Sequence, residues 1–127
     1  MRLPEMPNFS ISPEDKIRLQ HMLDAALEIQ QYALSSTRDN LDFDRKLVHS
    51  IVRLLEIIGE AASQISKQLK DETPSILWPI LIGMRNRLIH AYFSINLDVV
   101  WSTSIEDIPP LIEEISNILG NPEKNEI

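Results

Sequence analysis

Apolar residues in this chain recur at every third or fourth position over long stretches, and this spacing constrains the fold more than any other feature of the sequence. Because an α-helix has about 3.6 residues per turn, such spacing places the apolar side chains on one helical face. Strict alternation of apolar and polar residues, which is typical of half-buried strands, is absent, and glycine is scarce. The sequence therefore predicts an all-α protein, an up-and-down bundle of four to five helices.

Five helices are expected, at about 12–35, 42–69, 78–93, 97–104 and 107–119. Ser12 and Pro13 predict the first start, since serine is a good helix cap and proline suits the first helical position. Gly59 lies inside the second helix, where glycine costs about 1 kcal/mol relative to alanine. A close backbone approach by another helix would explain that glycine.

Polar residues and prolines punctuate the C-terminal third of the chain. Asn96 or Asp98 is expected to cap the fourth helix, and Asp107 the fifth. A cap at Asp107 would place both following prolines in the first turn, whose N–H groups lack intrahelical partners in any case. Gly120-Asn121-Pro122 is then expected to stop the last helix.

The chain of 127 residues is long enough for one hydrophobic core, so a single domain is expected. Its core should span about 12–119, with an N-terminal arm at 1–11 and a tail at 120–127. The absence of cysteine excludes disulfides and cysteine–zinc sites, and fits a cytoplasmic protein. No signal peptide is expected, because the N-terminus M-R-L-P-E-M-P lacks an apolar core. No membrane span is expected, because no run approaches ~20 apolar residues.

The net charge of −7 argues against a general nucleic-acid coat, because such proteins usually carry a basic patch. The charge is unevenly distributed, however. The middle of the chain, 45–90, contains a group of basic residues: Arg45, Lys46, Arg53, Lys67, Lys70, Arg85 and Arg87. A local positive cleft is therefore compatible with an acidic protein.

The stretch R-N-R-L-I-H-A-Y-F at 85–93 carries the candidate functional residues. On a single helix from 78 to 93, Arg85 would lie in the middle of an apolar stripe, and Tyr92 would project within about 20° of it. Asn86 and His90 would lie one turn apart. Because burying an unpaired guanidinium is costly, Arg85 would need a carboxylate partner, a subunit interface or an anionic ligand.

This stretch resembles the R-x4-H-x-Y signature of the HEPN superfamily, in its HepT-like toxin branch: Arg85, His90 and Tyr92 match position by position. Further short motifs follow in the order of that family and extend the resemblance over about 14–119. They are I-I-G-E-A-A at 57–62, Pro-x3-Trp at 74–78, G-M-R-N at 83–86, V-W at 100–101 and D-I-P at 107–109.

The resemblance implies a HEPN-like, metal-independent endoribonuclease that uses no cofactor. In such chemistry the RNA 2′-hydroxyl attacks its adjacent phosphate. Imidazole can act as acid or base near neutral pH, which fits His90, and a guanidinium can hold the phosphate and stabilise the transition state, which fits Arg85. Asn86 and Arg87 are expected to position the substrate. Structural support is expected from Gly59 and Glu60.

The resemblance also implies partners. HEPN ribonucleases generally form their active cleft between two protomers, so a homodimer is expected. HepT-like toxins are typically paired with a minimal nucleotidyltransferase antitoxin, the MntA-like protein, which attaches AMP to the motif tyrosine, here Tyr92. RNA is the expected substrate.

Two other functions fit the sequence. One is a non-catalytic HEPN module that binds a nucleotide or a nucleotidyltransferase, which the acidic net charge favours. The other is a purely structural helical dimer in which Arg85 pairs with Glu60. Glu56 and Glu60, one turn apart, would repel unless a cation lay between them, and Arg53 and Arg85 are the candidates.

Overall fold

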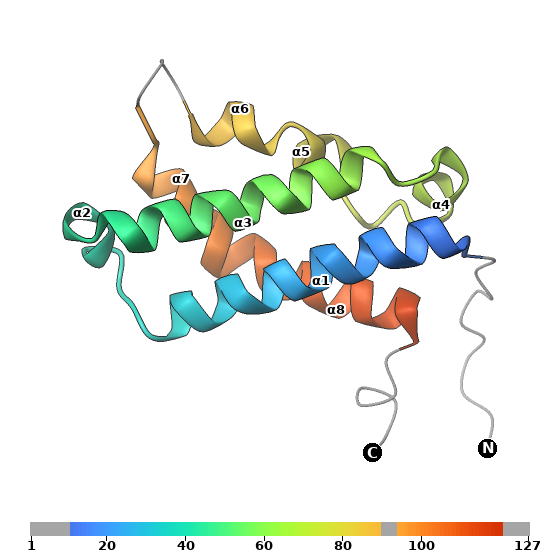
Figure 1. Cartoon of the computed structure of the whole chain (residues 1–127), viewed down its shortest axis with the longest axis horizontal. Coiled ribbons are helices and arrows are strands. Elements are labelled where there is room, and N and C mark those ends of the chain that lie inside the picture. The colour runs from blue at the N-terminus through green and yellow to red at the C-terminus, as the bar shows by residue number, and fades with distance from the viewer. Residues whose placement is uncertain (1–10, 90–93, 121–127) are drawn as a thin grey trace.

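The computed structural model describes residues 11–89 and 94–120, which fold into a helical bundle (Figure 1). The elements are α1 (Pro13–Leu34), α2 (Asn40–Phe43), α3 (Arg45–Ser63), α4 (Lys67–Glu72), α5 (Trp78–Ile82), α6 (Met84–Leu88), α7 (Leu97–Ser102), the π-helical turn η1 (Thr103–Asp107) and α8 (Ile108–Leu119). Within these two ranges no strand forms, and the only β-like feature is an isolated bridge between Ile89 and Ile95. The all-α prediction is confirmed.

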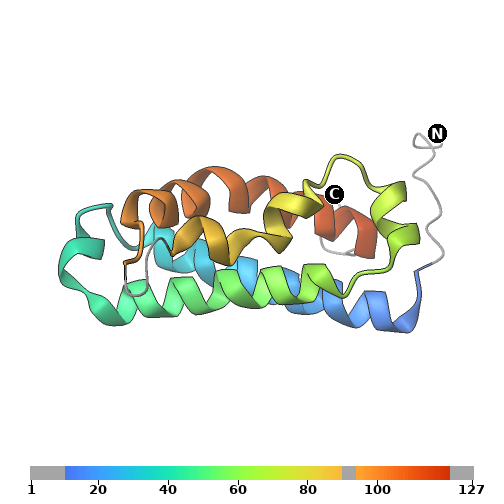
Figure 2. The ribbon, with the colours of Figure 1, turned by 90° about the horizontal axis from the view of Figure 1, so that it is seen from above.

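The main helices run up and down along the long axis of the bundle: α1, α3, the α5–α6 segment and the α7–η1–α8 segment. α1 and α3 lie side by side in opposite directions, and α8 crosses behind α1 (Figure 1). Seen from above, α5 and α6 lie between α3 and the continuous α7–η1–α8 segment (Figure 2). In the described part of the chain, no helix is both long and apolar enough to cross a membrane.

The start of α1 is fixed by two polar side chains. Ser12 caps the helix as expected, since its hydroxyl accepts from the backbone N–H of Asp15 at 3.0 Å. Asp15 itself is buried, only 3% exposed, and accepts from Ser66 twice: from the backbone N–H at 2.9 Å and from the hydroxyl at 2.5 Å. This carboxylate therefore joins the first turn of α1 to the first turn of α4.

We expect Asp15→Ala to lower the free energy of unfolding by about 1–3 kcal/mol, because it removes a charge-assisted acceptor and leaves two Ser66 donors without it. Asp71→Ala is the matched control, since Asp71 is an exposed carboxylate whose ion pair with Lys67 is also exposed. It should change stability by less than about 0.5 kcal/mol. Equal effects of the two substitutions in urea denaturation would contradict this role of Asp15.

The prediction of one helix over 42–69 was wrong. α3 begins only at Arg45, because Asp44 takes an extended backbone conformation and its side chain caps the helix by accepting from Leu47 N–H at 3.1 Å. The helix ends at Ser63, and Ser66 then caps the separate α4. Apolar periodicity continues across this break, so the pattern alone suggested a single helix.

The prediction of one helix over 78–93 was also wrong. The non-helical backbone of Gly83 separates α5 from α6, and α6 ends at Leu88. Ile89 is extended and bridges to Ile95 in antiparallel fashion, while Asn96 N–H donates to the carbonyl of Leu88 at 2.7 Å. Asn96 thus binds a backbone carbonyl at the end of α6 that the helix itself leaves without a partner.

The two C-terminal helices expected at 97–104 and 107–119 are joined by η1 into one continuous segment. Asn96, one of the two caps considered, accepts from Val99 N–H at 3.2 Å. Pro109 lies in the first turn of α8 as expected, but the predicted cap at Asp107 was wrong, because its backbone is helical and its side chain makes no capping hydrogen bond. A proline ring clashes with the carbonyl four residues earlier, and the wider π-helical turn relieves that crowding. Gly120 ends α8 with φ of 64°, the expected left-handed stop.

Candidate functional site

Arg85 projects from α6 toward α3. Its Nη1 lies 3.3 Å from Oε2 of Glu56, and its side chain is 73% exposed, whereas that of Glu56 is only 18% exposed. The expected position in the middle of a buried apolar stripe was therefore wrong. Of the three environments considered for this guanidinium, the described chain supplies a carboxylate partner.

The buried side of α5 and α6 explains why Arg85 faces outward. The side chains that enter the core recur at spacings of three and four: Trp78, Leu81, Met84 and Leu88. Arg85 follows Met84 directly and is therefore turned about 100° away from that buried face. Ile82, assigned to the stripe by the sequence pattern, is 40% exposed.

A cleft with a cavity volume of about 220 Å³ lies between α3 and the α5–α6 segment. We call it the Arg85 cleft; its lining residues are Glu56, Gly59, Glu60, Ser63, Ile82 and Arg85. In the described part of the chain, Arg85 forms its ion pair with a single carboxylate, that of Glu56, through Nη1. A guanidinium has five N–H donors, so most of this fork remains available to a phosphate.

At Gly59, the end of α5 comes close to the backbone of α3. A Cβ built at Gly59 would lie 2.8 Å from the carbonyl oxygen of Leu81, a distance that real Cβ contacts essentially never show. The close backbone approach expected from the sequence is present. It brings α5, and hence α6 with Arg85, against the Glu56 side of α3.

We expect Gly59→Ala to lower the free energy of unfolding by about 1–3 kcal/mol. Alanine in a helix would by itself gain about 1 kcal/mol over glycine, but the new methyl group meets backbone that cannot move independently of α5. Ser63→Ala, one turn later on the exposed side of α3, is the control and should have little effect. A Gly59→Ala protein more stable than its parent in thermal unfolding would refute the close-packing argument.

Glu60 does not pair with Arg85, so that part of the structural-dimer alternative was wrong. Its Oε1 lies 3.7 Å from Nη1 of Arg53, and both side chains are well exposed. Each of the two cations considered therefore pairs with a different member of the acidic pair. Arg53 lies against Glu60, and Arg85 lies against Glu56.

His90 and Tyr92 lie outside the described residues. The expectation that Tyr92 projects beside Arg85 assumed a helix to residue 93 and loses that basis, because α6 ends at Leu88. The neighbouring Ile89 donates its N–H to the carbonyl of Arg85 at 3.1 Å. This bond closes the end of α6 at Ile89, the last described residue before the gap.

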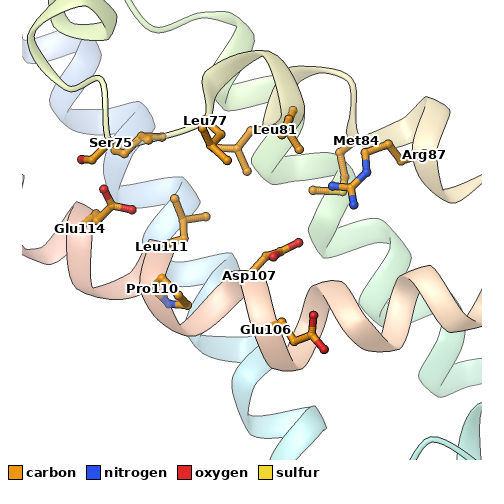
Figure 3. Close-up of a pocket in the computed structure, with 12 residues that line it drawn as sticks. Ser75, Leu77, Leu81, Met84, Arg87, Glu106, Asp107, Pro110, Leu111 and Glu114 are labelled. Atoms are coloured by element: carbon orange, nitrogen blue, oxygen red, sulfur yellow. The ribbon is translucent and has the colours of Figure 1, made fainter.

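Arg87 lies on a different hollow from Arg85. That hollow, of about 400 Å³, separates α5 and α6 from η1 and α8, and Arg87 points across it toward Asp107 and Glu106 (Figure 3). Asn86 is exposed on α6 between the two arginines. The structure thus places Glu56, Gly59, Glu60 and Arg85 together, whereas Arg87 faces elsewhere.

Glu56 is the residue whose role the sequence did not reveal. It was considered only as half of a repelling acidic pair, and Glu60 was taken as the more informative member. One available signal was its spacing of three residues before Gly59. That spacing places Glu56 on the side of α3 that the Gly59 contact turns toward α5 and α6.

Comparisons with known proteins identify relatives. A family model described as "Ribonuclease HepT-like" matches residues 22–118. The "Probable ribonuclease HepT" of Thermococcus cleftensis is 37% identical over 93 residues, covering 73% of this chain and 84% of that protein. The "Putative RNase TTE0752" of Caldanaerobacter subterraneus subsp. tengcongensis is 32% identical over 101 residues, covering 80% and 90%.

A third relative is longer. The "Gamma-glutamylcyclotransferase and putative RNase MJ0434" of Methanocaldococcus jannaschii is 34% identical over 110 residues, which are 87% of this chain. The chain spans only half, 50%, of that protein. No solved structure matches the chain significantly.

Proposed function

Because this chain belongs to the HepT-like ribonuclease family, we propose that it is an endoribonuclease that cleaves RNA without a metal ion, with Arg85 and His90 as its catalytic residues. The observation that carries the proposal is the state of Arg85. The Arg85 guanidinium is largely exposed and is held at a cleft by its contact with Glu56. Arg85 also precedes the motif histidine, His90, by five residues.

Arg85 would bind the scissile phosphate. The ion pair with Glu56 uses one edge of the guanidinium, and the remaining N–H donors can form two parallel bonds to phosphate oxygens. The same donors stabilise the additional negative charge that develops on phosphorus in the transition state. Glu56 therefore orients the guanidinium while leaving its phosphate-binding side open.

His90 would move the protons. As a base it removes the proton of the 2′-hydroxyl, whose oxygen attacks the adjacent phosphorus and expels the 5′-oxygen of the next nucleotide. As an acid a histidine returns a proton to that leaving oxygen. The products are a 2′,3′-cyclic phosphate and a 5′-hydroxyl, and no bond in this sequence needs an added oxidant or reductant.

A two-fold homodimer would place two such sets in one cleft. With two copies, one His90 can act as base while the other acts as acid, and two guanidinium groups can share one phosphate. The high exposure of Arg85 in the single chain supports this arrangement, because its open side is available to a second copy. Asn86, exposed beside Arg85, would help to position the substrate.

We also infer that the enzyme is the toxin of a toxin–antitoxin pair. Its antitoxin would be an MntA-like nucleotidyltransferase that transfers AMP to Tyr92, in line with the R-x4-H-x-Y motif in this chain. An enzyme that cleaves RNA with its own side chains needs no cofactor whose supply could limit its activity, so control by a partner protein suits it. Arg87, on the opposite side of α6 from the Arg85 cleft, is available to that partner or to a distal part of the RNA.

The test is cleavage of a mixed RNA pool by the purified protein in the presence of excess EDTA. We expect cleavage to continue under these conditions and light scattering to show a dimer at micromolar concentration. Loss of activity on chelation, with recovery only on addition of a divalent ion, would overturn metal independence. Full activity of a strictly monomeric protein would overturn the shared cleft.

A further inference from the structure

A hollow of about 370 Å³ between α1 and α3 lies outside the Arg85 cleft. We call it the α1–α3 hollow; it is lined by Glu28, Tyr32, His49, Ser50, Arg53 and Leu54. Glu28 and Tyr32 lie one turn apart on α1, and His49 and Arg53 lie one turn apart on α3. One helix thus supplies a carboxylate and an aromatic ring, and the other supplies an imidazole and a guanidinium.

These side chains are available to a ligand. Tyr32 is half-buried, and neither its hydroxyl nor the ring of His49 bonds to another residue in the described ranges. Among the described residues, Arg53 forms an ion pair with Glu60, at 3.7 Å and with 62% of its side chain exposed. An exposed ion pair of that length contributes little, so a phosphate can displace it readily.

We propose that the α1–α3 hollow is a subsite for one nucleotide of single-stranded RNA, next to the nucleotide that is cut. The base of this nucleotide stacks on Tyr32, and the phosphate of the same nucleotide contacts Arg53 and His49. Glu28, on the same helix as Tyr32, accepts from amino or imino groups on the base edge. The acidic and basic sides of the hollow thus match the two chemically different ends of a nucleotide.

The position of Arg53 links this subsite to the Arg85 cleft. Arg53 precedes Glu56 by three residues and Glu60 by seven, which corresponds to about 5 and about 10 Å of helix rise. Both carboxylates line the Arg85 cleft, and Glu60 is also the ion-pair partner of Arg53. An RNA strand whose phosphate sits at Arg85 can therefore reach Arg53 with its neighbouring nucleotide.

Single-stranded RNA is favoured over duplex RNA by the aromatic side chain. A base can stack on Tyr32 only when it has left its own stack, which loops and single strands allow. The basic residues on this part of α3 follow one helical face: exposed Lys46 precedes His49 by three residues, and His49 precedes Arg53 by four. Basic residues beside an aromatic ring are the usual composition of a single-strand binding surface.

This subsite rests on the proposed ribonuclease function, so its test measures binding separately from cleavage. The probe is a fluorescein-labelled, single-stranded RNA 2′-O-methylated throughout, which removes the attacking hydroxyl, and the readout is fluorescence anisotropy with the full chain. We expect Tyr32→Leu to weaken binding at least about fivefold, whereas Tyr32→Phe, which keeps the ring, should bind as the parent does. The double variant His49→Ala/Arg53→Ala should bind more weakly and with a shallower dependence on salt.

Lys16→Ala, an exposed cation on the far end of α1, is the control and should leave binding unchanged. Because His49 and Arg53 are exposed, their removal tests the subsite even if Tyr32→Leu disturbs packing. Parental affinity in both Tyr32→Leu and the double variant would overturn the subsite, as would equal weakening by Tyr32→Phe and Tyr32→Leu. Tyr32-dependent binding without cleavage of unmodified RNA would instead support the subsite and refute the proposed catalysis.

Discussion

His90→Ala and Arg85→Ala should each reduce RNA cleavage by about 10²- to 10⁴-fold while leaving the helical circular dichroism spectrum unchanged. The reason for Arg85 is its geometry, since a side chain that is 73% exposed contributes almost nothing to the core. The measurement is the rate of cleavage of a labelled RNA under single-turnover conditions. Mass spectrometry of parental products should show 2′,3′-cyclic phosphate and 5′-hydroxyl ends.

Two further variants separate phosphate recognition from charge alone. Arg85→Lys keeps the positive charge but loses the planar fork, so it should recover only part of the rate. Lys67→Ala removes an exposed cation on α4 that pairs with Asp71, and it should cleave as the parent does. A fully active Arg85→Lys enzyme would show that the guanidinium geometry is unnecessary, and a fully active His90→Ala enzyme would refute the proposed acid–base role.

Local chemistry made part of this fold predictable. The cap at Ser12 and the stop at Gly120 each depend on one residue and its immediate neighbours, and a glycine inside an expected helix marked where another helix comes close, at Gly59. A serine hydroxyl caps the helix that it precedes, and a glycine tolerates left-handed backbone or a near contact in any fold. These features were therefore visible without knowledge of the tertiary structure.

The helix breaks were not predictable, because distant contacts decide them. The start of α4 depends on Ser66, which is bound by Asp15 from another helix. The end of α6 depends on Asn96, whose N–H bonds the carbonyl of Leu88. The apolar period runs on through both breaks, so a pattern of spacing alone extends each helix too far.

In the candidate site, too, some features follow from the sequence alone and others depend on tertiary packing. The motif spacing of Arg85 and His90 is a property of the sequence, and it made both residues candidates. The partner of Arg85 is a property of packing, since the contact at Gly59 decides which turn of α3 faces α6. For this reason Glu60 was preferred from sequence, whereas Glu56 forms the ion pair.

Co-expression with an MntA-like nucleotidyltransferase should add one adenylyl group per modified chain at Tyr92 and should abolish RNA cleavage. Tyr92 follows His90 by two residues and completes the R-x4-H-x-Y motif. Intact-mass and peptide mass spectrometry would measure the modification, and the cleavage assay its effect.

The physical reason for inhibition is competition at Arg85. AMP joined to Tyr92 carries a phosphodiester with one negative charge, which the open side of the guanidinium can bind in place of the scissile phosphate. Modification would then inhibit without unfolding the protein, so the melting temperature should not fall.

Tyr92→Phe lacks the acceptor oxygen and should remain an active nuclease in the presence of the nucleotidyltransferase. Tyr32→Phe, which removes the other tyrosine hydroxyl of the chain, is the matched control and should still be silenced. If a catalytically inactive nucleotidyltransferase silences Tyr92→Phe as well as the parent, neutralisation is by binding alone and the adenylylation mechanism is wrong.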